Sequence, residues 1–306
     1  MKNGLFELDR NSRVNIHPRA RLKEAVTSLL YRYYDPDNLD ALVTEVEMLE
    51  DGSLHVELDC GVRFFTQQNG KVHNTRDHLS PRRYRSGKGK PHQSAKTEEV
   101  GSFRNLWYVL REIYIRNIYQ KYYKVKKGDI VVDAGANIGV FTVKAAKAVG
   151  DEGMVIAIEP EQDNLKFLER NVLANGLRNV VIISRGVWSS KDTLKLFIRG
   201  QTGHHSLVLH DGAHRFAEVE VDTLDNILEE LGIHKVDFIK MDIEGAEIEA
   251  CKGMAKTLSD NDVKIAIEVH KIGGVSQTSE IIASSLDRCG FQVYVEGTMV
   301  YGMKPR

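Results

Sequence analysis

Three carboxylates and one imidazole follow two strongly apolar runs of the chain, and these side chains could activate a hydroxyl group. Asp242 and Glu244 come directly after the run VDFIKM, and Glu268 and His270 end the run VKIAIEVH. A hydroxyl attacks poorly unless its proton is removed as the new bond forms, which a carboxylate or an imidazole can do. Asp242 and Glu244 could instead bind a divalent cation such as Mg²⁺, and that cation would acidify the hydroxyl.

Which member of this group is the base is open at this stage. His270 has the unperturbed pKa best suited to base catalysis at neutral pH, and Asp242 competes with it as a base or as a metal ligand. Glu268 and His270 are two residues apart on one predicted strand, so they point to the same face of the sheet. Structural roles are the alternative, because Glu244 could cap the following helix and Asp242 could bind backbone amides.

A second group of residues is typical of a nucleotide-binding loop. Ile130 to Phe141 reads IVVDAGANIGVF, in which a β-branched run precedes Asp133 and two glycines, Gly135 and Gly139. The glycine spacing is G-x-x-x-G, so the G-x-G-x-x-G fingerprint of dinucleotide sites is not met. An acid after the first strand would repel a pyrophosphate but suits the ammonium group of a methionine moiety. The loop therefore favours S-adenosyl-L-methionine (SAM). A valine at Gly135 is expected to abolish SAM binding and to leave the fold mostly intact.

Glu159 supports this interpretation. It ends the next apolar run, MVIAIE, 20 positions after Gly139. An acid that ends the second strand of such a fold can accept hydrogen bonds from both ribose hydroxyls. Either Asp133 or Glu159 alone could simply cap the helix that follows it. The two acids together, in this order and spacing, predict a cofactor site.

Composition excludes several classes of protein. Hydrophobic residues make up 42% and charged residues 28% of 306 residues, as in an ordinary globular protein of one or two domains. Lys and Arg total 42 against 43 Asp and Glu, which gives no sign of a nucleic-acid or membrane partner. Cys60, Cys251 and Cys289 are isolated and odd in number, which favours a reducing cytoplasm. The N-terminus is too polar for a signal peptide, and no run of about 18 apolar residues predicts a membrane span.

Strands and helices alternate from residue 129 onward, which predicts a parallel sheet with helices on both faces. The last two strands, 291–296 and 298–303, are separated only by Gly297, so they must form an antiparallel hairpin. We therefore predict an α/β fold with a doubly wound, mostly parallel seven-stranded sheet, the Rossmann-like architecture of class I SAM-dependent methyltransferases. The other predicted strands are 129–133, 154–159, 179–184, 236–241 and 263–269, with an added pair of edge strands at 191–199 and 217–221. The predicted helices are 138–149, 161–175, 223–231, 246–258 and 277–289.

Residues 1–100 predict a small α+β region ahead of a methyltransferase domain at 101–306. Its expected elements are a helix at 21–34 and strands at 41–50, 53–59 and 62–66. The segment 71–96 is rich in Lys, Arg, Gly and Pro, and is either a linker or a lid that meets an anionic group on the acceptor. An aromatic-rich helix is expected at 103–123. His205 lies on the loop after the first edge strand and could line the mouth of the site.

Five segments together resemble the FkbM family of SAM-dependent methyltransferases, over roughly residues 100 to 306. The run IKMDIEGAE is the most specific of them, because many methyltransferases share the glycine loop. The resemblance implies O-methylation of hydroxyls on sugars, polyketides and related metabolites. The segments are DAGANIGVF at 133–141, IAIEP at 156–160, VEVDTLDNI at 219–227, VDFIKMDIEGAE at 236–247 and IAIEVH at 265–270.

The same resemblance implies roles for individual residues. The methionine part of SAM would meet the glycine loop, and Glu159 would hold the ribose. Gly186 and Val187, beyond the third strand, would lie beside the adenine. The loop residues are Asp133, Gly135, Asn137 and Gly139.

Two other functions remain open. An RNA methyltransferase would share the glycine loop, and the basic segment 71–96 could follow phosphates. The neutral net charge and the lack of a recognisable RNA-binding motif argue against a stable nucleic-acid complex, so a small hydroxylated acceptor is the expected partner. A SAM-binding scaffold without turnover is the other alternative, although such a protein would be expected to lose the polar residues at its strand ends.

Overall fold

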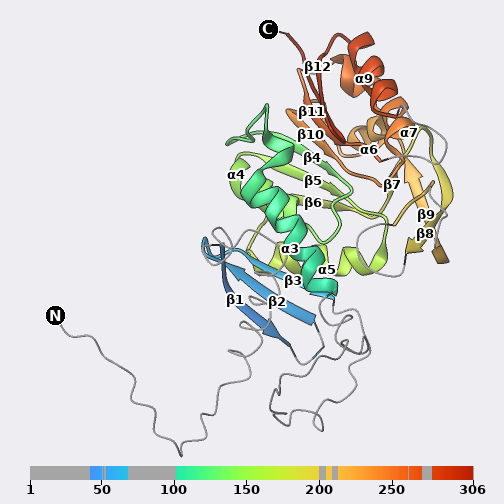
Figure 1. Ribbon diagram of the computed structural model, residues 1–306. Coiled ribbons are helices and arrows are strands. Elements are labelled where there is room, and N and C mark those ends of the chain that lie inside the picture. The colour runs from blue at the N-terminus through green and yellow to red at the C-terminus, as the bar shows by residue number, and fades with distance from the viewer. Residues whose placement is uncertain are drawn as a thin grey trace, which may run out of the picture.

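The computed structural model describes residues 42–49, 51, 53–67, 101–199, 205–208, 213–260, 262–270 and 278–305. The helix predicted at 21–34 and the basic segment 71–96 lie outside these residues. Within them, strands and helices alternate as the sequence predicts (Figure 1). No helix of the described part is long and apolar enough to cross a membrane.

A seven-stranded sheet forms the centre of the fold, in the order β12-β13-β11-β10-β4-β5-β6. The five strands from β6 to β11 are parallel, and β13 pairs antiparallel with both β11 and β12. The predicted sheet and its C-terminal hairpin are thus confirmed. The strands are β4 (Ile130–Ala134), β5 (Met154–Ile158), β6 (Val180–Ile183), β10 (Phe238–Met241), β11 (Lys264–Glu268), β12 (Gln292–Glu296) and β13 (Met299–Met303).

The order of these strands locates the ligand site. From β4 the chain proceeds through β5 to β6 on one side, and later through β10 to β11 on the other. Open α/β sheets bind ligands outside the carboxyl ends of the strands at the point where the order reverses. That point lies between β4 and β10, so the residues that follow these two strands face the site.

Both faces of the sheet are covered, because consecutive residues of a buried strand point to opposite sides. Val131 packs with α3 and α4 on one face, whereas Val132 packs with α6 to α9 on the other (Figure 1). Both side chains are fully buried. The helices are α3 (Gly101–Leu110), α4 (Val140–Val149), α5 (Gln162–Ala174), α6 (Leu224–Glu230), α7 (Glu247–Lys252), α8 (Ala255–Asp260) and α9 (Thr278–Arg288).

The prediction of a single helix at 103–123 is wrong. The α-helix ends at Leu110 and continues as a π-helix, η3 (Arg111–Arg116), and a short 3₁₀ turn, η4 (Ile118–Gln120). Asn117 separates the last two with a left-handed backbone, φ 53°. The amino group of Lys144, from α4, donates to the carbonyl of Ile113 and to Asn117 Oδ1. This tertiary contact satisfies backbone groups that a continuous helix would have used.

Two more expectations need correction. The predicted edge strands, β8 (Asp192–Arg199) and β9 (Ala213–Asp222), do not join the large sheet but pair with β7 (Gly186–Val187) in a separate one. The helix predicted at 246–258 is divided into α7 and α8. Gly253 lies at the break, where a Cβ would be 2.0 Å from the carbonyl oxygen of Trp188. The helix ends there because the backbones at Gly253 and Trp188 lie so close together. The periodicity of the sequence does not reveal such a contact.

The predicted strands of the N-terminal region are confirmed as an antiparallel sheet of β1 (Val43–Met48), β2 (Ser53–Leu58) and β3 (Arg63–Gln67). Asn171 of α5 bonds the exposed edge of β3, accepting from the amide of Phe65 at 2.6 Å and donating to its carbonyl at 3.1 Å. The same side chain donates to the carbonyl of Ile138, in the glycine loop, at 2.7 Å. Asn171 thus joins this sheet to the loop. The domain boundary near residue 100 stays a prediction.

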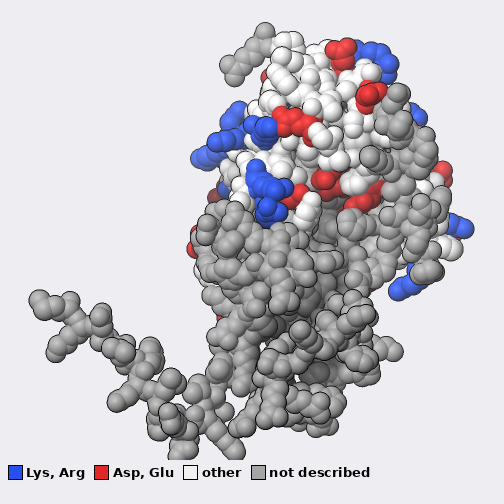
Figure 2. Space-filling model, in the orientation of Figure 1, with Lys and Arg blue, Asp and Glu red and all other residues white. Residues whose placement is uncertain are grey.

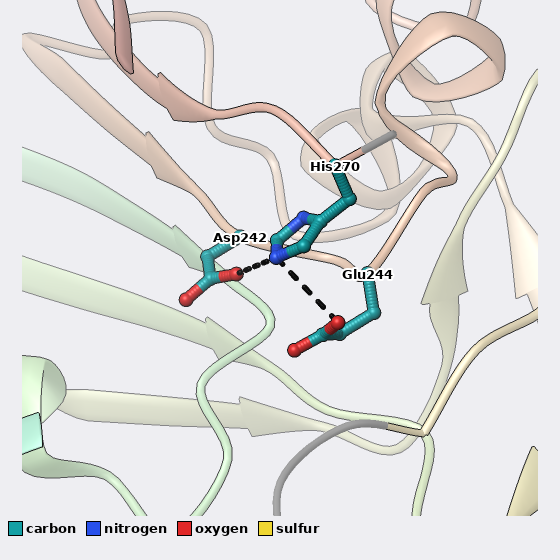
Figure 3. A group of neighbouring side chains, drawn as sticks. All are labelled: Asp242, Glu244 and His270. Carbon is teal, nitrogen blue, oxygen red and sulfur yellow. Dashed lines mark ion pairs between the residues drawn. The ribbon is translucent and has the colours of Figure 1, made fainter. Parts of the chain in front are cut away.

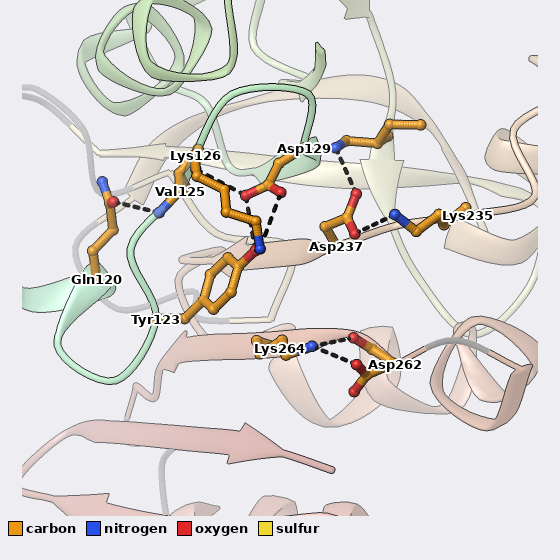
Figure 4. Close-up of polar contacts among 10 residues, drawn as sticks. Gln120, Tyr123, Val125, Lys126, Asp129, Lys235, Asp237, Asp262 and Lys264 are labelled. Atoms are coloured by element: carbon orange, nitrogen blue, oxygen red, sulfur yellow. Dashed lines mark hydrogen bonds and ion pairs between the residues drawn. The ribbon is translucent and has the colours of Figure 1, made fainter. Parts of the chain in front are cut away.

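Carboxylates at the amino ends of the parallel strands have well-matched partners (Figure 4). Asp129 accepts from the hydroxyl of Tyr123 at 2.9 Å. Asp237 accepts from the amide of Ile130 at 2.9 Å and pairs with Lys235 at 2.6 Å. These bonds fix the starts of β4 and β10.

Candidate active site

A cleft with about 610 Å³ of empty space opens at the carboxyl ends of β4, β5 and β10. Most of its lining comes from the strand ends that the sequence analysis singled out. The lining residues are Gly135, Asn137, Ile158, Glu159, Pro160, Asn164, Arg185, Gly186, Val187, Leu196, His205, Leu207, Asp242, Ile243 and Glu244.

Asp133 holds the two central strands together and does not line this cleft. Its side chain is fully buried, with Oδ1 3.1 Å from the amino group of Lys240 on β10 and Oδ2 accepting from the hydroxyl of Thr142 on α4 at 2.6 Å. Burial raises the pKa of Asp133, and the charge of Lys240 opposes that shift. A direct contact between Asp133 and the methionine moiety therefore stays a prediction. The structure shows a buried ion pair between β4 and β10.

Gly135 is required for the packing of the loops after β4 and β10. Its φ is +76°, and an added Cβ would lie 1.8 Å from the carbonyl oxygen of Asp242. The prediction that valine at this position leaves the fold mostly intact is therefore wrong, because the side chain would force the two loops apart. Gly139, with φ +87°, precedes α4, where a left-handed backbone turns the loop into the helix.

Glu159 is built into the cleft by the glycine loop and by α5. Its Oε2 accepts from the amide of Asn137 at 2.8 Å, and its Oε1 accepts from the amide of Glu161 at 3.0 Å and from the side chain of Asn164 at 3.1 Å. Asn137 has a left-handed backbone, φ 53°, which aims its amide at the carboxylate. Glu159 is only 6% exposed, and burial raises its pKa to about 7.

One end of the cleft is largely apolar. Gly186 and Val187 of β7 line it, as the sequence predicts for the adenine side, and His205 lines it as well. Leu196 and Leu207 complete this wall, and sequence reasoning gave them no role. The separate β7-β9-β8 sheet, which the sequence analysis misplaced, supplies most of this surface.

Asp242, Glu244 and His270 bring together one potential ligand atom each, all within 4.8 Å of one another. Figure 3 shows the imidazole turned toward the two carboxylates. His270 Nε2 lies 3.8 Å from Asp242 Oδ1 and 3.5 Å from Glu244 Oε2. Glu244 has φ 53°, and its carbonyl accepts from the hydroxyl of Ser206 at 2.5 Å. The convergence of these three predicted residues is thus observed.

Glu247 stands behind His270, and sequence reasoning gave it no role. It is fully buried, and its Oε1 lies 2.9 Å from His270 Nδ1 and accepts from the amide of Gly245 at 3.0 Å. This contact leaves Nε2 as the nitrogen that faces the carboxylates. The run DIEGAE held the signal, because a helix that begins at Glu247 places that side chain inward, against the next strand end.

Glu268 lies close to this group and does not take part in it. Tyr119 joins the two, because its hydroxyl is 2.9 Å from Asp242 Oδ2 and 2.7 Å from Glu268 Oε2. Burial and the negative charge of Asp242 raise the pKa of Glu268 to about 7. Tyr119 belongs to η4, which follows the break in the predicted aromatic helix. This break therefore brings Tyr119 between Asp242 and Glu268.

The sequence profile of the Methyltransferase FkbM domain matches residues 133–293, which is more than half of the 306 residues. The chain belongs to the FkbM methyltransferase family. Its fold and its cleft at the switch between β4 and β10 agree with SAM as the cofactor of this family.

Individual relatives of this FkbM methyltransferase are distant. Methyltransferase sdnD from Sordaria araneosa is 26% identical over 235 residues, covering 64% of this chain and 89% of that protein. AMB antimetabolite synthetase AmbE from Pseudomonas aeruginosa is 24% identical over 230 residues, covering 61% of this chain and 11% of that protein. The solved methyltransferase FkbM from Methylobacillus flagellatus KT is 21% identical with a TM-score of 0.46, covering 62% of this chain and 46% of that one.

The cleft of the FkbM methyltransferase suits SAM. The hydrogen bonds to Glu159 come from the glycine loop, from Glu161 and from α5. They leave carboxylate lone pairs that can accept hydrogen bonds from the ribose hydroxyls. Val187, Leu196 and Leu207 offer apolar contact to an adenine ring.

His270 is less suited to base catalysis than its unperturbed pKa indicates. Burial works to lower the pKa of His270, but the hydrogen bond to Glu247 and the charges of Glu244 and Asp242 outweigh it and raise the pKa to about 9. An imidazole with such a pKa holds its proton at neutral pH and cannot accept another. The surroundings of His270 therefore favour a role in binding over a role as base.

Proposed function

We propose that this FkbM methyltransferase transfers the methyl group of SAM to a hydroxyl oxygen of a small metabolite. The observation that supports it best is the position of Asp242, which lines the same cleft as Glu159 and adjoins His270. Glu159 would bind the ribose, so an acceptor beside Asp242 would approach the cofactor from the other end. The name of the relative AmbE refers to the synthesis of an antimetabolite, which fits a small-molecule acceptor.

SAM, when bound, supplies a methyl carbon on a positively charged sulfur, which makes displacement by an oxygen nucleophile feasible. The protein must then hold the acceptor oxygen in line and receive its proton. The Asp242 carboxylate can accept that proton as the new oxygen–carbon bond forms. Tyr119 connects Asp242 to Glu268, so the hydrogen-bonded chain can take up the charge change within the site.

Charge supports a neutral acceptor over a polyanion. Asp242, Glu244 and Glu268 lie together beside the cleft. On the face seen in Figure 2, groups of Asp and Glu side chains lie among groups of Lys and Arg side chains. A phosphodiester backbone would be repelled beside the cleft. Hydroxyl groups of a sugar or polyketide would instead find carboxylate acceptors.

The test is incubation with methyl-labelled SAM and a panel of hydroxylated sugars, polyketides and RNA. We expect label in a hydroxylated small molecule and release of one S-adenosylhomocysteine per methyl group, with mass spectrometry placing the methyl group on oxygen. Asp242→Asn should abolish most of this transfer. Glu249→Gln, a charge change on the exposed side of α7, is the matched control. Label in RNA alone would contradict the proposal.

A further inference from the structure

Asp242, Glu244 and His270 converge beside the cleft without forming hydrogen bonds of good length with one another. The distances of 3.5 and 3.8 Å from His270 Nε2 to the two carboxylates exceed those of good hydrogen bonds, which are about 2.7–3.2 Å. Three ligands of one metal ion, each roughly 2.0–2.2 Å from it, lie about 3.0–3.6 Å apart. The two distances from His270 Nε2 lie at or just beyond the upper end of this range, so a small movement of the side chains would bring the three atoms to the spacing of a ligand set.

Glu247 supplies an independent reason to expect a cation. Its carboxylate is fully buried, and among the described residues its Oε2 has no hydrogen-bond partner. A buried carboxylate is costly unless a positive charge lies nearby. Its Oε1 orients His270 through Nδ1. Without a metal ion a protonated imidazole supplies that charge, and a cation that displaced the proton from Nε2 would supply it instead. Histidine ligands of metals commonly have such a carboxylate on the other ring nitrogen.

The backbone holds the three side chains at this point. The amide of Asp242 donates to the carbonyl of Ala134 at 3.0 Å, and the carbonyl of Glu244 accepts from Ser206. The left-handed conformation of Glu244 and the φ of +102° at Gly245 make a tight turn directly after β10, and Asp242 and Glu244 both line the cleft. Such fixed positions reduce the conformational entropy that a ligand set loses on binding.

We propose that Asp242, Glu244 and His270 bind one divalent metal ion, which also binds the acceptor hydroxyl. The role of the metal in catalysis rests on the proposed function, whereas the binding of the metal does not. Two carboxylate oxygens and one imidazole nitrogen suit Mn²⁺ better than Mg²⁺, which prefers oxygen alone. Three protein ligands leave positions open for a hydroxyl oxygen, whose pKa the metal would lower. Glu247 is then a positioning residue, which fixes the ring of His270.

The experiment measures metal binding without SAM or acceptor. The full chain, stripped with chelator, is titrated with Mn²⁺ and free Mn²⁺ is followed by electron paramagnetic resonance. We expect one Mn²⁺ per chain. Affinity should fall by about 10-fold or more in Asp242→Asn and His270→Gln, and by about 10-fold in Glu247→Gln. Glu249→Gln, on the same helix, should bind like the parent. Binding no tighter than millimolar, or equal in all variants, would overturn the inference.

Two further readouts separate this inference from the proposed function. Bound Mn²⁺ should show nitrogen modulation in pulsed spectra, and His270→Gln should lose it although its SAM affinity is retained. Persistence of the nitrogen signal in that variant would refute the assignment of His270. SAM binding without a Mn²⁺ site would overturn only the metal inference, whereas a Mn²⁺ site in a protein that methylates no hydroxyl would support the site and contradict the proposed function.

Discussion

The two ends of the parallel sheet both carry carboxylates but use them differently. At the amino ends, Asp129 and Asp237 are matched by a hydroxyl, backbone amides and lysine (Figure 4). At the carboxyl ends, Asp242 and Glu244 share one imidazole (Figure 3), and Asp242 and Glu268 share the hydroxyl of Tyr119. Excess negative charge at one point destabilises a fold, so its presence beside a cleft indicates a functional site.

Asp133 is the exception at the carboxyl end, because its charge is matched by Lys240 in the interior. Removing one partner of a buried ion pair leaves the other without compensation. The acids therefore differ in their partners as well as in their position on the sheet. Substitutions can test both differences.

The largest effect is expected for Asp133→Asn. Loss of the carboxylate charge leaves the buried Lys240 unpaired, which should lower the free energy of unfolding by about 3–5 kcal/mol. Urea denaturation measures it. Asp129→Asn, at the other end of β4, should cost about 1 kcal/mol. The double variant Asp133→Asn with Lys240→Met should be more stable than Asp133→Asn alone. Equal losses in the two single variants would contradict the assignment.

Asp242→Asn should lower kcat by about 100-fold or more, because it removes the carboxylate that we propose as the acceptor of the hydroxyl proton. SAM affinity, measured by calorimetry, should stay within about threefold of the parent. Asp237→Asn is the matched control, since it changes the same residue type at the amino end of the same strand. We expect it to lower thermal stability and to keep kcat within about threefold. A kcat loss of similar size in both variants would show that the two ends do not differ.

Glu159→Gln should weaken SAM binding by about 10- to 30-fold, because charge-assisted hydrogen bonds contribute roughly 1.5–3 kcal/mol each. Titration calorimetry gives the affinity, and Asp163→Asn on the exposed surface of α5 is the control. Affinity unchanged in Glu159→Gln would remove this residue from the cofactor site.

SAM binding by the parent should weaken by about tenfold between pH 8 and pH 6. The pKa of Glu159 is about 7, so its carboxylate is ionised above that pH and protonated below it, and the ionised form is the better hydrogen-bond acceptor. The stability of the unliganded protein depends on pH in the opposite direction. Because the pKa of Glu159 is higher in the folded than in the unfolded protein, its contribution to stability is fully present below the unfolded pKa and is lost as pH rises through 7. In Glu159→Gln, SAM affinity should change little between pH 8 and pH 6. An identical pH dependence of SAM affinity in the parent and the variant would contradict this prediction.

Much of the site could be predicted because its members follow apolar runs. Glu159, Asp242 and His270 each follow a run of mostly buried residues, and a strand of that kind ends where its apolar run ends. The parallel order of the strands then places all these residues at one edge of the sheet. Local pattern was therefore enough to name most of the cleft, though not to assign what each residue does.

The contacts that were missed join residues distant in sequence. Tyr119 meets Asp242 across 123 positions, and Glu247 meets His270 across 23. Neither contact has a periodic signal, because each depends on how two loops pack after the sheet has formed. The same is true of β8 and β9, whose alternating pattern predicts strands but not the sheet they join.

The sequence by itself determined the α/β alternation, the C-terminal hairpin, the glycine loop and the acids at the strand ends, because neighbouring residues specify strand, turn and helix. Only the tertiary structure decided which charges are compensated. It paired Asp133 with Lys240, placed Glu247 behind His270 and left Asp242 at the cleft. The physical reason is that the role of an ionisable side chain depends on its burial and on the charges around it, and both come from other elements of the fold.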